Sequence, residues 1–271
     1  MPARISEVHL VLCFIPYVGS ATFDHLLREC RLRGIEPERL LGMDADRLRQ
    51  EFGLRPISAR ALSSGAPQAK RRAQEFLQTA EGKPVRMLTR DSPLYPASLE
   101  SFCPSPPGYL FLYGNERLLE NPTFCVLASR DATEKDLSRA ARLVEEQTLA
   151  GKTLVTGADT KPYQRAALVP LRWGAPRIVV LDRGLVQALG QNLDRELFSA
   201  ARVWRQRFDP EMDLAISFGR PDEGASKSAL ARRDELVVGL SNEVYAVRLR
   251  EGGTMAKLAA RAERNGKTVS P

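Results

Sequence analysis

The chain has 271 residues, of which 43% are hydrophobic and 27% are charged, with a net charge of +7 and a pI of about 9.4. This composition excludes a disordered or fibrous protein and supplies a core for one large domain or two modest ones. The longest apolar stretch near the start, "VHLVLCFIP", is too short to cross a bilayer and has no cleavage site behind it, so we expect a cytoplasmic protein without a membrane partner.

The first part of the chain, residues 1–82, has a helical pattern with three interruptions. These breaks are "IPYVGS", "LRGIEPERLLGM" and "SSGAPQ". Glycine, proline and small polar residues end helices, so the pattern predicts several short helices packed into a small helical domain.

Residues 83–120 are rich in prolines and aromatic residues and contain two short strand-like pieces, "VRMLT" and "YLFLYG". Short apolar runs bounded by proline and glycine favour strands. We interpret this segment as a connector that packs on the edge of the next domain's sheet.

From residue 121 to residue 271, short apolar strands alternate with amphipathic helices. The expected strands are "TFCVLA", "TLVTG", "RIVVLD", "DLAISFG" and "EVYAVRL". The expected helices are "EKDLSRAARLVEEQTLAG", "PYQRAALVPLRWG", "NLDRELFSAARVWRQRF" and "ALARRDELVVGLS". Such alternation predicts an α/β domain with a doubly wound, mostly parallel sheet, in which ligands bind at the carboxyl ends of the strands.

The positive charge is concentrated in this second part. Residues 121–271 carry 24 basic and 19 acidic side chains, against 16 and 14 in residues 1–120. A basic excess favours a polyanionic partner, so we place the binding surface in the second part.

The loop after the first of these strands, "ASRDAT", has the features of an anion site. Thr133 stands where a helix N-cap is expected, and Arg130 adds a forked cation suited to phosphate. Ser129 is small enough to allow a close approach. Free backbone N–H groups at the helix start attract anions.

Further candidate residues come from two more loops and one helix of the same part. The loop after the second strand supplies Lys161. The loop after the last strand supplies Gly252, Gly253 and Thr254, and Lys257 follows in the next helix. Glycines allow backbone to approach phosphate closely. Arg232 and Arg233 open the helix before the last strand and can reach the same rim.

Catalytic and metal chemistry finds little support. The four cysteines lie far apart, which favours buried thiols over a zinc site or a disulfide framework. His9 and His25 both lie in the helical part, so the second part lacks the base of a Ser-His or Cys-His centre. We therefore expect no catalytic residue, no metal ion and no cofactor.

Several stretches of the chain resemble the DNA-processing protein A family (DprA, also called Smf). These are "FIPYVGSATFDHLL", similar to a helix-hairpin-helix, "RDSPLYPASL", similar to Asp-x-x-Tyr-Pro-x-x-Leu, "PPGYLFLYGN" and "VLASRDAT", similar to V-G-S-R-x-A-T. The stretch "RRDELVVGLS" resembles R-N-R-I-I-x-G-L-S and is followed by a glycine loop. The resemblance covers essentially the whole chain.

This resemblance implies a small helical domain (helix-hairpin-helix or SAM-like) joined to a Rossmann-like domain. It implies single-stranded DNA binding in DNA uptake (natural transformation) and recombination, delivery of the strand to a RecA-type recombinase, and a homodimer. Carried over by position, Ser129, Arg130 and Thr133 fall in the first binding loop, and Gly252 to Thr254 fall in the last. Arg233 falls on the first arginine of R-N-R.

The chain also departs from the family pattern. Ala128 replaces the expected loop glycine, and the second loop, "TGADTKPYQRAAL", has fewer glycines and no histidine. Asp234 and Glu235 stand where the pattern has asparagine and the second arginine. Two carboxylates beside a phosphate path would repel it, which predicts an altered DNA site. The sequence given ends at "GKTVSP", so we expect no winged-helix extension.

A second hypothesis is a Rossmann-like nucleotide-binding sensor, or a nucleotide-processing enzyme related to the lysine-decarboxylase-like group. Asp234 and Glu235 would suit a ribose hydroxyl in that case. The P-G-G-x-G-T-x-x-E stretch of that group is missing, and "EGGT" is its nearest counterpart here. We therefore favour a DNA-binding protein that is not an enzyme.

Overall fold

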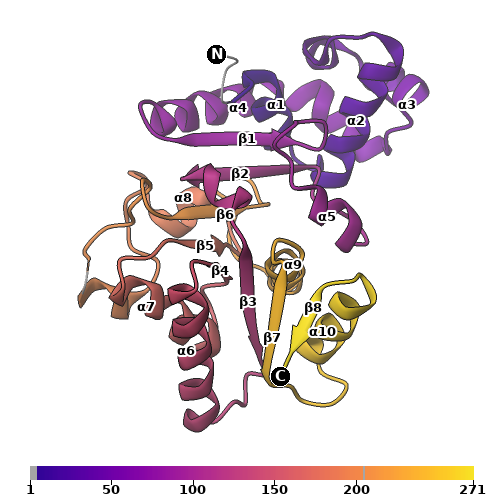
Figure 1. The fold of residues 1–271 in the computed structure, drawn as a ribbon. Helices are drawn as coiled ribbons and strands as arrows, with labels where there is room; N and C mark the ends of the chain where they lie inside the picture. The colour runs from indigo at the N-terminus through magenta and orange to yellow at the C-terminus, as the bar shows by residue number, and fades with distance from the viewer. Residues whose placement is uncertain (1–4, 204) are drawn as a thin grey trace. The chain divides into compact units, whose positions relative to one another are not determined.

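The computed structural model describes residues 5–203 and 205–271, and the chain forms two units (Figure 1). The first unit consists of Met1–Tyr95, Pro107–Phe111 and Phe218–Arg220. The second consists of Pro96–Pro106, Leu112–Ser217 and Pro221–Pro271. The first four residues of the predicted helical segment 1–82, and Trp204 of the helix predicted over 192–208, lie outside the described residues.

The first unit is mainly helical, as the sequence predicts. Its helices pack through aromatic and aliphatic side chains, among which Leu10, Phe23 and Phe52 are at most 1% exposed. Strand β1 is hydrogen-bonded to β2 (Tyr109–Gly114), whose first three residues belong to this unit. The other elements are α1 (Glu7–Phe14), α2 (Ser20–Arg33), η1 (Pro37–Gly42), α3 (Ala45–Phe52), α4 (Pro56–Ala80) and β1 (Val85–Thr89).

Helix α4 corrects one expectation, because it runs without interruption through "SSGAPQ", where the sequence predicted a break. Its buried residues recur at helical spacing on both sides of Pro67, from Leu62 and Ala66 to Ala69, Ala73 and Phe76. Burial of this stripe against the neighbouring helices offsets the local cost of glycine and proline inside a helix.

The second unit is built on a parallel sheet with the strand order β6-β5-β4-β3-β7-β8, and β2 enters beside β6. Each neighbouring pair from β6 to β8 is parallel. The chain winds outward from β3 to β6 and then returns to place β7 on the other side of β3. The order of the strands therefore reverses between β3 and β7, which is the point where such sheets bind ligands.

Helices cover both faces of this sheet (Figure 1), which confirms the predicted doubly wound α/β class. Alternate side chains of β3, Phe124 and Val126, pack with Ala140 and Val144 of α6 and with Val169 of α7. Helices α9 and α10 pack against each other and also contact the sheet.

The strands of this unit are β3 (Thr123–Ala128), β4 (Thr153–Thr156), β5 (Arg177–Val180), β6 (Leu214–Ser217), β7 (Glu243–Arg248) and β8 (Thr268–Ser270). Its α-helices are α5 (Ala97–Phe102), α6 (Glu134–Leu149), α7 (Lys161–Arg172), α8 (Leu185–Leu189), α9 (Lys227–Gly239) and α10 (Thr254–Arg264). The unit also contains the short 3₁₀ helices η2 (Glu116–Glu120) and η3 (Ser199–Val203).

The prediction of a helix over 192–208 is wrong, since η3 is the one helical element among the described residues of that range and Arg195 forms an isolated antiparallel bridge with Arg207. A buried charge network explains the difference. Arg177 donates from Nη2 to Glu196 Oε1 (2.9 Å) and from Nε to Asp213 Oδ2 (2.9 Å), and all three side chains are 0% exposed. Arg205 pairs with both carboxylates from the other side. Satisfying these buried charges fixes the segment in an irregular path.

The cysteine prediction is confirmed, because Cys13, Cys30, Cys103 and Cys125 are all buried and free of disulfides. Burial raises the pKa of the Cys30 thiol to about 11 and that of the Cys125 thiol to about 12, which keeps both protonated. In the described ranges, none of the helices has the length and apolar character of a bilayer span.

Candidate functional site

The loops that follow β3 and β7 are hydrogen-bonded to each other where the strand order reverses. Ser129 N–H donates to the Arg248 carbonyl oxygen (2.7 Å), and Arg250 N–H donates to Ser129 Oγ (2.8 Å). The register between the two strands also shifts after Leu127. Ser129 therefore holds the two loops side by side, and its hydroxyl already accepts one hydrogen bond.

A cavity of about 540 Å³ opens between these loops and the start of α9, and we call it the switch-point cavity. Its volume is within the range of small-ligand sites. It is lined by Ala128, Ser129, Arg130, Asp131, Thr160, Lys227, Leu230, Ala231, Asp234, Arg250, Gly253, Thr254 and Met255.

Three cations on the wall of this cavity are exposed and make no ion pair or side-chain hydrogen bond with any described residue. They are Arg130 on the loop after β3, Lys227 in the first turn of α9, and Arg250 on the loop after β7. Asp131 lies among them, so the lining is mixed but has an excess of positive charge. Unpaired cations from three separate elements converge on one small volume, which favours an anionic ligand.

The amino end of α10 adds backbone donors. Its N-cap, Gly253, provides no side-chain hydrogen bond, whereas Thr133, Thr160 and Ser226 cap α6, α7 and α9 with their hydroxyls. Gly252 adopts φ +67°, which permits the turn into the helix. The first N–H groups of an uncapped helix carry partial positive charge and are suited to bind phosphate oxygens.

Arg233, expected at the rim, is instead buried, with 1% exposure. It pairs with Asp159 and with Asp234 (2.9 Å), and its guanidinium lies over the Tyr163 ring at 4.8 Å. A Cβ on Gly157 would lie 2.4 Å from Arg233 Nη1, so the glycine makes room for this side chain. Burial acts to lower the Arg233 pKa, but the hydrogen bond to Asp159 and the nearby carboxylates outweigh burial and raise it.

The expected position of Arg233 at the rim is therefore corrected, because its guanidinium is buried. Its Nε and Nη1 donate to Asp234 and Asp159, so the charge holds the loop after β4 against α9. Arg232, its neighbour, is half-buried and donates from Nη2 to the Ser105 carbonyl oxygen (2.7 Å). The sequence could not separate these two adjacent arginines, because helical periodicity alone does not reveal which carboxylates face them.

Three other predicted residues lie outside the cavity lining. Thr133 forms a capping box with Asp136, in which its hydroxyl donates to Asp136 Oδ2 (2.7 Å) and accepts from Asp136 N–H (3.3 Å). The Thr133 hydroxyl bond lowers the Asp136 pKa. Lys257 is exposed on α10, and Lys161 lines a neighbouring cavity. Ser129, Arg130, Gly253 and Thr254 are the predicted residues that the structure brings together, with Gly252 beside them.

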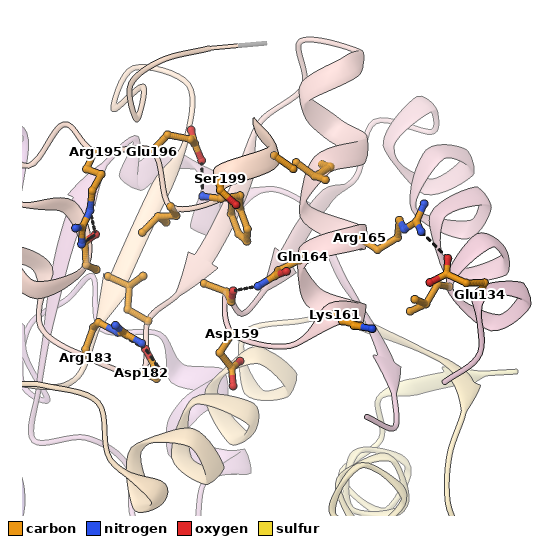
Figure 2. A pocket seen from close by; sticks show the side chains of 18 residues that line it. Glu134, Asp159, Lys161, Gln164, Arg165, Asp182, Arg183, Arg195, Glu196 and Ser199 are labelled. Atoms are coloured by element: carbon orange, nitrogen blue, oxygen red, sulfur yellow. Dashed lines mark hydrogen bonds and ion pairs between the residues drawn. The ribbon is translucent and has the colours of Figure 1, made fainter. Parts of the chain in front are cut away.

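The neighbouring cavity, of about 460 Å³, lies beside α7 and the loop after β5 (Figure 2). Most of its charged lining is already paired, since Arg165 contacts Glu134 (2.7 Å) and Arg183 contacts Asp182 (2.8 Å). Arg195 donates to the carbonyl oxygens of residues 187 and 188. Lys161 and Arg195 make no ion pair with a described residue, but Arg195 is already hydrogen-bonded to backbone, so this cavity offers fewer available cations than the switch-point cavity.

The two acidic residues that break the family pattern lie in different surroundings. Asp234 lines the switch-point cavity, and burial raises its pKa while the charge of Arg233 opposes that rise. Glu235 pairs with Arg261 of α10 at 2.9 Å and does not line the cavity. Of these two carboxylates only Asp234 lines the cavity, and its charge is partly offset by Arg233, which also pairs with Asp159.

Sequence reasoning missed Lys227 and Arg250. A signal for both exists, because every helix that leads from one parallel strand to the next begins at the carboxyl edge of the sheet. The first turn of α9 and the residues directly after β7 must therefore lie at that edge. The lining, all of it described, contains no histidine and no cysteine, and its charged groups are Arg130, Lys227 and Arg250 with Asp131 and Asp234.

Comparison with known proteins identifies a matching family model and similar solved structures, two of which are described here. The family model described as DNA recombination-mediator protein A matches residues 86–270. DNA processing protein A from Streptococcus pneumoniae is similar over 98% of this chain and 86% of its own, with a TM-score of 0.70 and 16% identity. No curated protein gives a significant match.

The second structure is DNA processing protein A from Helicobacter pylori, described for its single-stranded DNA binding mode. It is 17% identical, with a TM-score of 0.53, and the similarity covers 69% of this chain and 80% of the other. At these identities the two structures support the fold.

Proposed function

The chain belongs to the DNA recombination-mediator protein A family, and from this premise we propose that it binds single-stranded DNA at the switch-point cavity. Family membership also confirms the resemblance to DNA-processing protein A on which the sequence analysis relied. The proposal concerns a binding protein, with phosphate as the recognised group and no chemical step.

One observation carries this proposal, namely that Arg130, Lys227 and Arg250 meet unpaired around the uncapped start of α10. Each cation that contacts a phosphate releases a condensed counterion, which drives binding at low salt. The backbone N–H group of Thr254, in the first turn of α10, adds a directional donor, whereas that of Gly253 already donates to the Arg250 carbonyl oxygen (3.0 Å). Leu230 and Met255 in the same lining offer apolar surface against which a base can rest.

The family resemblance also suggests what the bound strand is used for in the cell. We infer that the bound strand is delivered to a RecA-type recombinase during DNA uptake and recombination, that the protein works as a homodimer, and that it does so in the cytoplasm. The resemblance of "RDSPLYPASL" and "RRDELVVGLS" to the family stretches supports this inference.

A nucleotide-binding sensor is the second candidate, and one observation favours it. Asp234 is a buried carboxylate that faces a cavity large enough for a single nucleotide, where it could accept a hydrogen bond from a ribose hydroxyl. The two candidates differ in ligand length. A sensor binds a mononucleotide about as well as an oligonucleotide, whereas a DNA-binding protein gains affinity with each phosphate contacted.

The test is fluorescence anisotropy of a labelled, mixed-sequence oligodeoxynucleotide at two salt concentrations, with unlabelled mononucleotide as competitor. The proposal predicts affinity that falls steeply with salt and poor competition by the mononucleotide. Arg130→Ala should weaken binding and reduce the slope of log K against log salt by about 0.7.

The matched control is Arg142→Ala, which removes an exposed arginine about two turns after the start of α6 and outside the cavity lining. This variant should leave the slope unchanged. Anisotropy that stays flat at low salt contradicts the proposal. Effective competition by the mononucleotide favours the sensor.

A further inference from the structure

Asp234 combines burial with access to the switch-point cavity. Its side chain is 9% exposed and lines the cavity wall. Oδ1 accepts two hydrogen bonds, from the Tyr163 hydroxyl (2.9 Å) and from Arg233 Nε (2.9 Å). No donor from the described residues reaches Oδ2. Because Thr148 Oγ1 is the one fully enclosed side-chain atom without a partner in the described chain, Asp234 Oδ2 must be open to the cavity.

The orientation of this carboxylate is fixed from behind. Tyr163 and Arg233 are 3% and 1% exposed, and Asp159 holds Arg233 from the other side. Both donors require an acceptor at Oδ1, so rotation of the carboxylate would leave a buried donor unpaired. Oδ2 is consequently a preorganised acceptor that points to the space where a ligand would lie.

The rest of the lining determines which part of a nucleotide meets this oxygen. The cations Arg130, Lys227 and Arg250 take the phosphate, and the apolar side chains of Leu230 and Met255 suit the flat face of a base. A nucleotide unit anchored in this way presents its base or sugar to Asp234. A carboxylate can only accept hydrogen bonds, so it discriminates between ligand edges that donate and edges that accept.

Given the proposed function, on which this step rests, we propose that Asp234 makes the switch-point cavity selective for a base with an exocyclic amino group. Oδ2 accepts a hydrogen bond from that amino group, as carboxylates do from the N4 amino group of cytosine. A base with a carbonyl oxygen at the same place would bring two acceptors together and leave both unpaired in a buried site. The cavity therefore disfavours uracil and thymine.

Asn at this position, which is the residue of the family stretch R-N-R, would have the opposite effect. In an Asp234→Asn variant, Tyr163 and Arg233 still require an acceptor, so the amide oxygen takes the place of Oδ1. The amide NH₂ then takes the place of Oδ2 and donates into the cavity. The shape is kept while the acceptor becomes a donor, so this variant favours a carbonyl-bearing base.

The experiment compares labelled oligodeoxycytidine with oligodeoxyuridine of equal length, using the full chain and fluorescence anisotropy at constant salt. The two ligands differ only in the group at base position 4 and in the protonation of the adjacent ring nitrogen. We expect the unmodified protein to bind oligodeoxycytidine about fivefold or more tightly than oligodeoxyuridine. Asp234→Asn should abolish or invert this ratio.

The control variant is Glu235→Gln, which removes the same charge from the same helix at a carboxylate that does not line the cavity. Its affinity for both ligands should change by the same factor, so that the ratio is kept. Equal affinities in the unmodified protein, or a ratio that survives in Asp234→Asn, overturn the selectivity. The ligand comparison stands without the variant if Asp234→Asn does not fold. Failure of both ligands to bind contradicts the proposed function as well.

Discussion

Arginines at the two ends of the parallel sheet have opposite surroundings. At the amino end of β5, Arg177 is fully buried and shares Asp213 and Glu196 with Arg205. At the carboxyl ends of β3 and β7, Arg130 and Arg250 are exposed and unpaired by described residues. The same side chain therefore stabilises the fold at one end and remains available to a ligand at the other.

The difference is energetic as well as geometric. A buried guanidinium without partners is strongly unfavourable, so the amino end supplies carboxylates in matching number. Exposed cations around the switch-point cavity contribute little to folding and repel one another weakly. Their convergence gains nothing for stability, which points to a function in binding.

Arg233 shows that position at the carboxyl edge is not sufficient for contact with a ligand. It lies behind the cavity wall and pairs with both Asp159 and Asp234. Its charge shapes the cavity from behind, by fixing the loop after β4 and the carboxylate of Asp234. Arg233 therefore resembles the buried, paired arginines in its structural role, although it lies next to the proposed binding surface.

The largest effect is expected when the buried network is broken. Arg177→Met leaves Asp213 and Glu196 with Arg205 as their remaining basic partner and removes the hydrogen bond from Nη1 to the Ala167 carbonyl oxygen (2.9 Å). We expect the free energy of unfolding to fall by about 3 to 5 kcal/mol in urea denaturation.

Arg207→Met is the matched control for that change, because this arginine is 80% exposed and its contact with Asp194 spans 3.7 Å. Its effect should stay within about 0.5 kcal/mol. Equal losses in the two variants would show that the buried network does not stabilise the unit.

A smaller loss is expected at Arg233, because Asp159 keeps partial contact with water after the arginine is removed. Arg233→Met should lower the free energy of unfolding by about 2 to 3 kcal/mol, since Asp234 loses its buried partner. The adjacent Arg232→Met removes a single hydrogen bond to Ser105 and should cost about 1 kcal/mol or less. Urea denaturation of both variants measures these free energies of unfolding. A larger decrease for Arg232→Met than for Arg233→Met would contradict the structural role of Arg233.

The sequence predicts most of this fold because periodicity and turn residues are local signals. Strands β3 to β7 and the helices between β3 and β5 lie where the pattern puts them. The pattern fails over 63–68, where packing of a buried stripe overrides glycine and proline, and over 192–208. In that second segment the buried Glu196 accepts a hydrogen bond from Arg177, which lies nineteen positions away in the chain.

The candidate site is predictable only in part, because contacts between residues far apart in the sequence decide which side chains are available. Strand ends and small residues identify the loops around Ser129 and Gly253, so Arg130 and Thr254 follow from the sequence. Whether an arginine is free or paired depends on contacts such as that between Arg233 and Asp159, which are 74 positions apart. No local pattern carries that information, so the sequence predicts Arg233 at the rim and does not single out Lys227.

In the proposed function, the unpaired cations of the switch-point cavity, and not the buried arginines, bind the phosphates. The most direct test is the salt dependence of oligonucleotide binding by a variant with Arg130, Lys227 and Arg250 all changed to alanine. We expect the slope of log K against log salt to be shallower by about 2, with the free energy of unfolding unchanged. A slope as steep as that of the unmodified protein would contradict it.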